Sequence, residues 1–252
     1  MHMQIDRKLT EFPRVRLMTE VTPVERLNRM SDRLGIDLWL KRDDLTGLSF
    51  GGNKTRQLEF YFGEALHQKA DTVLITGAVQ SNFVRTAAAA AARLGMTSVL
   101  QLEERVPGMG PAYYRSGNVL LAQILGAEHM HFPVGEDEVG ADNALHDRAA
   151  RLRAEGRTPY VIHLGVDHPP LGALGYVQGG AELADQMAEF DVAVVPSGSS
   201  PVSLKPTTCG ISIVMACPSM AASASMPPTP QPSTPRPLTM VVWESVPTQV
   251  SG

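Results

Sequence analysis

The sequence predicts an α/β fold with open, mainly parallel sheets and flanking helices. Apolar runs of strand length alternate along residues 1–200 with segments whose apolar residues recur at helical spacing. The helical segments are long enough to cross back over a sheet, which is typical of parallel βαβ units. Ligands bind such folds at the carboxyl ends of strands, in the loops that lead into helices.

The alternation predicts six strands and five helices. The clearest strand is the uninterrupted run TVLIT, and the clearest helix follows the sequence Gly-Gly-Asn. Strands are expected at 38–41, 72–76, 98–102, 128–132, 160–163 and 191–195. Helices are expected at 53–70, 82–94, 117–125, 141–155 and 172–190. The loops that matter for function are therefore those at 51–54, 77–82, 165–172 and from 197 onward.

The composition excludes several classes of partner. The 252 residues are 43% hydrophobic and 19% charged, and a net charge of −4 attracts neither nucleic acid nor an anionic membrane. No run approaches the roughly 18 apolar residues of a membrane span, and the first residues carry charges where a signal peptide has its apolar core. Cys209 and Cys217 form neither a disulfide framework nor a zinc pattern. We therefore expect a cytoplasmic protein with no nucleic-acid or membrane partner.

The chain changes composition near residue 200. The last 52 residues hold 10 of the 19 prolines and three charged side chains, Lys205, Arg236 and Glu244. Such a segment buries too little apolar surface to offset its ordering entropy, so 201–252 is expected to be disordered. A natural disordered tail is one explanation. A frameshift or aberrant splice is the favoured one, because the change directly follows a strand and half of a Gly/Ser loop.

Lys54 stands in the first turn of an expected helix, within LKRDDLTGLSFGGNKTRQLEF (40–60). Gly51-Gly52 permits a tight turn, and Asn53 suits an N-cap. The positive end of the helix dipole disfavours a cation there and so lowers the pKa of the amine. An amine that loses its proton readily is what Schiff-base chemistry requires. Taken alone, a solvated lysine at a helix start explains the same pattern.

Two further motifs follow strands. In ITGAVQSNFVRTAAAAAARLG (75–95), Ser81 and Asn82 present a hydroxyl and an amide at a helix start, where ordinary capping is the simpler explanation. In VAVVPSGS (192–199), an apolar strand leads into Ser-Gly-Ser, which suits a phosphate-binding loop. Pro201 then removes a backbone donor where a helix should begin, so this loop alone is a weak signal.

Together and in this order, the motifs resemble the 1-aminocyclopropane-1-carboxylate deaminase/D-cysteine desulfhydrase family. Its members bind pyridoxal 5′-phosphate (PLP) and have the tryptophan synthase β-like fold. The resemblance covers roughly residues 8–199 and includes FPRVRL, TPVERLNRMSDRLG, GNVLLAQILGAE and HPPLGALGYVQGGAELADQ. It implies two intertwined α/β subdomains within 1–200, the smaller at roughly 50–165, a fold incomplete at the C-terminus, and a homodimer in the intact form.

The resemblance assigns a role to each motif. Lys54 occupies the place of the lysine that binds the cofactor and later moves protons at the substrate α-carbon. Ser81 matches the serine that contacts substrate and assists proton transfer, and Asn82 matches the asparagine that hydrogen-bonds the ring hydroxyl of the cofactor. The first half of the phosphate loop corresponds to Ser197, Gly198 and Ser199.

The chain also departs from the family pattern. Phe83 stands where the family usually has a histidine or a polar residue, which alters the pocket wall or the choice of substrate. Beyond Ser199, the Gly-Thr continuation and the helix of the phosphate loop are missing. The later strands, the partner of the pyridine nitrogen and the C-terminal tyrosines that contact substrate are missing as well.

The implied reaction is that of a PLP-dependent lyase or deaminase, which releases ammonia and a 2-oxo acid from a small amino acid. β-Elimination of sulfide from D-cysteine is the leading case, and 1-aminocyclopropane-1-carboxylate deaminase and L-cysteate sulfo-lyase share the same motifs. The alternative is a catalytically impaired remnant, because half a phosphate loop loses several charge-assisted hydrogen bonds.

A metal site is not expected. His129 and His131 lie two apart on an expected strand and face one way, so they suit the start of a site that His146, His163 or His168 would join. No carboxylate or cysteine spacing supports that site.

Overall fold

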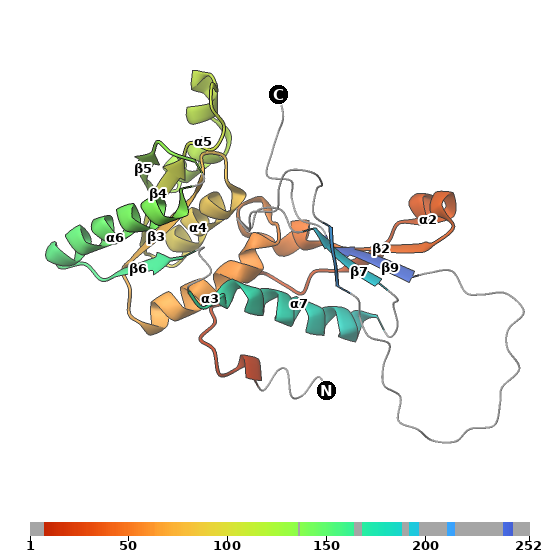
Figure 1. Cartoon of the computed structure of the whole chain (residues 1–252). Helices are drawn as coiled ribbons and strands as arrows, with labels where there is room; N and C mark the ends of the chain where they lie inside the picture. Colours follow the sequence, from red (N-terminus) through yellow and green to blue (C-terminus); the bar gives the residue numbers. More distant parts are fainter. Residues whose placement is uncertain are drawn as a thin grey trace, which may run out of the picture.

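The structure is a computed structural model that describes residues 8–135, 137–163, 168–187, 192–196, 211–214 and 239–243. Two β-sheets with flanking helices form its framework (Figure 1). The predicted α/β class is therefore confirmed. All six predicted strands and five predicted helices are present, and their ends differ from the prediction by at most four residues. Within the described ranges, no helix is both long and apolar enough to cross a bilayer.

The smaller sheet has four parallel strands in the order β5-β4-β3-β6. They are β3 (Thr72–Ala78), β4 (Thr97–Glu103), β5 (Glu128–Phe132) and β6 (Pro159–Ile162). Ile75 of β3 lies opposite Leu100 of β4 and Ile162 of β6, so the centre of the sheet is apolar. All four strands fall within the range 50–165 expected for the smaller subdomain, although the subdomain boundary itself stays a prediction.

Helices cover both faces of this sheet because the side chains of a strand alternate between its faces. Ile75 packs in one cluster with the alanines of α4 (Asn82–Arg93). Leu74 packs in a second cluster with Leu145 of α6 (Glu138–Ala154). The small side chains of the α4 alanines let this helix approach the strands closely.

The larger sheet has five strands in the order β1-β2-β9-β7-β8. They are β1 (Val24–Arg26), β2 (Asp37–Lys41), β7 (Val192–Pro196), β8 (Ile211–Val214) and β9 (Thr239–Trp243). β9 lies parallel to both β2 and β7 and joins them, whereas β1 and β8 are antiparallel edge strands.

Two of these strands lie in the segment 201–252, which the composition predicts to be disordered. For β8 and β9 this expectation is wrong. Both are short runs without proline, ISIV and TMVVW, and they hold the β-branched residues that favour strands locally despite proline-rich flanks. Val241 of β9 is buried. The rest of the segment lies outside the described residues.

The helices α3 (Lys54–His67) and α7 (Leu171–Gln186) pack side by side (Figure 1). Their backbones approach most closely at Gly175, where a Cβ atom would lie 2.4 Å from the carbonyl oxygen of Arg56. Only glycine fits this position, because that distance is far inside van der Waals contact.

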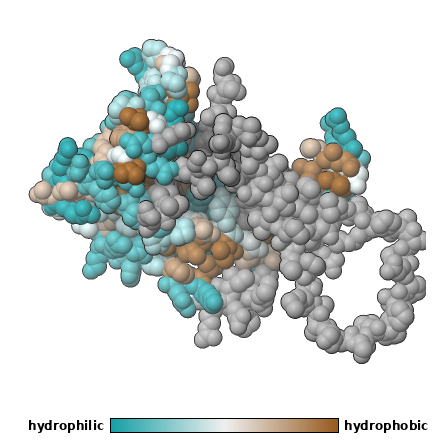
Figure 2. Space-filling view, in the orientation of Figure 1, coloured by the Kyte–Doolittle hydropathy of each residue, from teal (hydrophilic) through white to brown (hydrophobic). Residues whose placement is uncertain are grey.

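The surface differs between the two halves of the molecule. The side chains over the four-stranded half are mostly hydrophilic, and a hydrophobic patch lies on α2 (Asn28–Leu34) (Figure 2). In that patch Met30 and Leu34 are 52% and 54% exposed. Three 3₁₀ turns complete the described elements, namely η1 (Asp43–Thr46), η2 (Leu48–Phe50) and η3 (Pro111–Tyr114), together with α5 (Gly117–Ile124).

Candidate active site

Lys54 begins α3, directly after a turn that only glycines can make. Gly51 and Gly52 have φ angles of +72° and +105°, in the left-handed region. A Cβ atom on Gly51 would lie 1.8 Å from the carbonyl oxygen of Asp44, and the Gly52 N–H donates to the carbonyl of Asp43 at 2.8 Å. The glycine pair thus packs directly against the backbone of η1. This contact fixes where α3 starts and where Lys54 stands.

The amine of Lys54 lies beside an aromatic ring and has no anionic partner among the described residues. Its Nζ is 5.9 Å from the centroid of the Phe83 ring. Within the described part of the chain, no carboxylate or hydrogen-bond acceptor holds this nitrogen. Burial therefore lowers the pKa of Lys54, since desolvation disfavours the ammonium form. The direction is the one that the sequence predicts, and burial is the cause.

Ser81 is the N-cap of α4, as the motif predicts. Its Oγ accepts a hydrogen bond from the backbone N–H of Val84 at 3.4 Å. A Cβ atom on Gly77 would lie 2.7 Å from Val84 Cγ2 and 3.2 Å from Ser81 Oγ, so glycine suits the end of β3 where it passes the start of α4. The hydroxyl accepts from the backbone and keeps its own hydrogen for another acceptor.

The side-chain amide of Asn82 is held through its oxygen. Asn118 Nδ2 donates to Asn82 Oδ1 at 2.9 Å and to the carbonyl of Gln80 at 2.7 Å. Gln80 Oε1 in turn accepts from the backbone N–H of Asn118 at 2.9 Å. With its oxygen engaged by α5, Asn82 keeps its NH₂ group as a donor that no other described residue accepts.

Arg85 ties α4 to the segment in front of Lys54. Its guanidinium donates to the carbonyl oxygen of Ser49 and, at 3.2 Å, to Ser49 Oγ. The same group lies 5.7 Å from the centroid of the Phe50 ring. Ser49 and Phe50 have φ angles of +47° and +69°, a strained conformation for residues other than glycine. Arg85 therefore stabilises the strained segment that leads into the Gly51-Gly52 turn.

Asn53, the predicted N-cap of α3, does not cap the helix with its side chain. Its Nδ2 donates instead to the hydroxyl of Tyr176 at 2.5 Å, which links the start of α3 to α7. One turn further along, Arg56 forms buried ion pairs with Asp43 and Glu182, both at 2.8 Å. The helix that carries Lys54 is therefore fixed at its first turn by two separate segments of the chain, η1 and α7.

The structure does not describe all of the predicted site residues. Ser197, Gly198 and Ser199 lie outside the described residues, so the phosphate loop stays a prediction. Gln80, Asn118 and Arg85 are the functional residues that the sequence motifs do not assign. Gln80 and Asn118 stand inside segments that carry the family resemblance, but only the packing of the helices shows that they hold Asn82.

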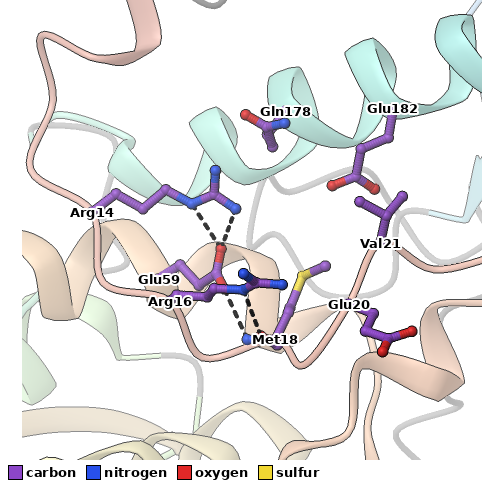
Figure 3. A pocket seen from close by; sticks show the side chains of 8 residues that line it. All are labelled: Arg14, Arg16, Met18, Glu20, Val21, Glu59, Gln178 and Glu182. Atoms are coloured by element: carbon purple, nitrogen blue, oxygen red, sulfur yellow. Dashed lines mark hydrogen bonds and ion pairs between the residues drawn. The ribbon is translucent and has the colours of Figure 1, made fainter.

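A pocket of about 410 Å³ lies elsewhere, between the N-terminal segment, α3 and α7 (Figure 3). Its lining consists of Arg14, Arg16, Met18, Glu20, Val21, Glu59, Gln178 and Glu182. The predicted site residues do not line it. Arg14 donates to Glu59 Oε2 at 2.6 Å, and the backbone N–H groups of Leu17 and Met18 donate to Glu59 Oε1. Glu59 thus binds the N-terminal segment to α3.

Comparisons with known proteins show the family to which this chain belongs. The model of the family described as "Pyridoxal-phosphate dependent enzyme" matches residues 15–202, and this match ends where the composition changes. A D-cysteine desulfhydrase of Serratia proteamaculans (strain 568) is 44% identical over 207 residues, which are 79% of this chain and 60% of that protein. A D-cysteine desulfhydrase of Yersinia pestis is 42% identical over 201 residues, with the same coverage.

The solved structures that resemble this chain are enzymes of the same fold. A crystal structure described as an ACC deaminase homologue is 40% identical, with a TM-score of 0.70, and the match covers 79% of this chain and 58% of that one. A diaminopropionate ammonia lyase of Escherichia coli, at 17% identity and a TM-score of 0.54, shares the fold. The chain spans about 60% of the length of the curated relatives that it matches.

Proposed function

Because the chain belongs to the family of pyridoxal-phosphate-dependent enzymes, we propose that it is a lyase or deaminase of small amino acids with its cofactor held at Lys54. The fold is that of the tryptophan synthase β-like members of this family. The observation that carries the proposal is the position of the Lys54 amine, which is desolvated, without a described counter-charge, and beside the residue that follows Ser81-Asn82.

The described residues fit an aldehyde cofactor with a ring hydroxyl. A primary amine attacks an aldehyde only when it has lost its proton, and burial favours the neutral amine of Lys54. The NH₂ group of Asn82 supplies a donor for the ring hydroxyl oxygen, because Asn118 already engages the amide oxygen. Phe83 supplies an apolar wall beside the amine.

PLP supplies an electron-withdrawing ring that stabilises negative charge at the α-carbon of a bound amino acid. In the proposed mechanism, Lys54 holds the cofactor and then takes the α-proton with its ε-nitrogen. Ser81 is proposed to donate its hydroxyl hydrogen to the substrate, because its contact with Val84 N–H uses an oxygen lone pair and leaves the hydrogen unused. Asn82 orients the ring. Ser197, Gly198 and Ser199 are proposed to bind part of the phosphate.

D-Cysteine is the proposed leading substrate, with sulfide, ammonia and pyruvate as products, because the 42–44% identical relatives are D-cysteine desulfhydrases. 1-Aminocyclopropane-1-carboxylate and L-cysteate are the alternatives, and a chain that binds the cofactor without turnover is the second candidate. The resemblance also supports a homodimer in the intact form and a place in the cytoplasm.

The test uses the purified full chain, incubated with PLP and then reduced with borohydride. Reduction fixes the cofactor covalently to the amine that holds it, and peptide mass mapping is expected to locate it on Lys54. A Lys54→Ala variant should lose the absorbance of bound cofactor, and a Lys69→Ala variant, which alters an exposed lysine of the same region, should keep it. No bound PLP in the parent, or PLP binding unaltered by Lys54→Ala, would contradict the proposal.

Turnover separates the two candidate functions. Sulfide and pyruvate are measured with D-cysteine, sulfite with L-cysteate, and 2-oxobutanoate with 1-aminocyclopropane-1-carboxylate. Product from one of these substrates identifies the enzyme. Bound cofactor without any product identifies the impaired remnant.

A further inference from the structure

Three histidines and one carboxylate gather at the carboxyl end of β6. His163 directly follows this strand, and His168 stands shortly before α7. Asp142 and His146 lie on α6, four residues apart and therefore on the same face of the helix. The ring centroids of His146 and His163 are 5.0 Å apart, and those of His163 and His168 are 3.6 Å apart.

The ligand atoms of this cluster are close enough to converge on one ion. One nitrogen each from His163 and His168 and one carboxylate oxygen of Asp142 all lie within 4.8 Å of one another. In a tetrahedral zinc site with metal–ligand distances of 2.0–2.2 Å, neighbouring ligand atoms are about 3.3 Å apart. Because the His163 and His168 rings stack almost in parallel, at least one of them must turn for both nitrogens to face a single ion. The ring of His146 lies beside that of His163, but its nitrogens are outside this group of three.

Hydrogen bonding within the described residues does not account for the cluster. His163 Nδ1 is buried and has no hydrogen-bond partner there. Asp142 Oδ1, which lies 3.8 Å from His163 Nδ1, is beyond hydrogen-bond distance. The rings of His163 and His168 stack almost in parallel, at 10°, and two imidazolium ions would repel each other at this separation. Neutral imidazole with an unused lone pair is the form that binds a metal ion.

We propose that Asp142, His163 and His168 bind a zinc ion, with water in the fourth position. Two imidazoles and a carboxylate are ligands that zinc accepts, whereas calcium and magnesium prefer oxygen alone. The ion ties α6 to the end of β6 and to the segment before α7.

The metal site considered from the sequence starts at His129 and His131, which His146, His163 or His168 would join, and no carboxylate spacing supports it. His129 and His131 lie on β5, which β4 and β3 separate from β6, so they cannot contribute to this cluster. The missing carboxylate is Asp142, which only the packing of α6 on β6 brings to His163.

The test uses the full chain with Cys209 and Cys217 both changed to serine, so that no thiol competes for metal. After removal of metal with a chelator, the protein is titrated with Co²⁺, whose visible absorption reports tetrahedral coordination, and then with Zn²⁺. We expect one equivalent of Co²⁺ to bind, Zn²⁺ to displace it, and the melting temperature to rise with Zn²⁺. None of these readouts depends on PLP, so their failure is distinct from failure of the proposed enzyme function.

The variants His163→Ala, His168→Ala and Asp142→Asn should each weaken zinc binding at least about tenfold, since loss of even an indirect partner of a metal ligand costs 10–100-fold. His67→Ala removes an exposed histidine at the end of α3 and is expected to leave the affinity unchanged. Circular dichroism of the metal-free variants verifies folding, and His168→Asn serves if a variant unfolds. The proposal is overturned if the parent shows no saturable binding, or if the cluster variants bind as the parent does.

Discussion

The ε-nitrogen of Lys54 lies 5.9 Å from the centroid of the Phe83 ring. Phe83 in turn packs edge-on against Tyr61, with ring centroids 6.4 Å apart. Tyr61 stands two turns after Lys54 on α3, so the Phe83 ring packs against α3 along its first two turns. The relationship brings the Gly-Gly-Asn-Lys motif and the Gln-Ser-Asn motif to the same place, although neither motif predicts the other.

The buried amine of Lys54 should be reactive at lower pH than an ordinary lysine. Burial lowers its pKa, so the neutral amine is populated below the usual range. Competitive acetylation of the PLP-free chain across a pH series, read by peptide mass spectrometry, measures this. Exposed Lys69 is the internal reference. A labelling midpoint for Lys54 at or above that of Lys69 would show that the amine is not desolvated.

The same pKa shift predicts that Lys54→Met stabilises the PLP-free chain at neutral pH. The unfolded chain binds the lysine proton up to a pKa of about 10.4, whereas the folded chain releases it at lower pH. The lowered pKa therefore costs the folded state stability at pH 7, and this cost disappears as the pH rises to about 10.4. Thermal melts of the two chains at pH 7 and pH 10 should show a gain in melting temperature only at pH 7. Lys69→Met is the control, with no gain expected at either pH.

Arg56→Leu should destabilise the protein strongly. Arg56 is buried between Asp43 and Glu182, and its removal leaves two buried carboxylates without the positive charge that pairs with both. The loss of one partner of a buried pair costs about 3–5 kcal/mol. Urea unfolding measures the difference. Arg26→Leu breaks the exposed pair with Asp37 and should cost about 1 kcal/mol or less. Equal effects of the two substitutions would contradict the buried network.

Two glycines of α7 should respond oppositely to alanine. At Gly175 a Cβ atom would lie 2.4 Å from the Arg56 carbonyl oxygen, so alanine forces α7 away from α3. At Gly180 a Cβ atom meets nothing within 4 Å, and alanine there should stabilise the helix by about 0.4–1 kcal/mol. Chemical unfolding of Gly175→Ala should show a loss of about 1–3 kcal/mol, typical of overpacking. A gain in both variants would mean that the helices do not pack as described.

Asn118→Ala should weaken the binding of PLP although it leaves Lys54 unchanged. Asn118 engages the oxygen of Asn82 at 2.9 Å, so its loss frees the amide that is proposed to bind the ring hydroxyl. One hydrogen bond is worth about 0.5–1.5 kcal/mol, which corresponds to about a three- to tenfold higher dissociation constant for PLP. Fluorescence titration with PLP measures it. Asn143→Ala alters an exposed asparagine on α6 and should bind PLP as the parent does.

The parallel half of the fold could be predicted from the sequence because its strands are apolar and separated by crossover helices. The run at 72–76 and the helix from residue 82 appear where hydrophobic periodicity places them. β1 and α2 were not predicted, because VER has no apolar alternation and a seven-residue helix gives little periodicity. β9 was not predicted because a short apolar run between proline-rich segments gives no local sign of a partner strand.

The candidate site could be predicted only where local motifs carry it. Lys54, Ser81 and Asn82 each belong to a turn that begins a helix, and the sequence shows such turns. The support for Asn82 comes from Asn118, 36 residues further along the chain, and the metal cluster combines α6 with the end of β6. Contacts of this kind depend on packing between distant segments, which periodicity and spacing do not encode.

Lys41 adds a second cation to the buried group around Arg56, with its Nζ 3.2 Å from Glu182 Oε2. Two positive and two negative side chains therefore balance in the interior, and one of the two negative charges comes from α7. A chain that ended before Leu171 would hold both cations against Asp43 alone. The charges of the interior thus balance only when α7 packs and brings in Glu182. Until then, the side chains of Lys41 on β2 and Arg56 on α3 must stay in water.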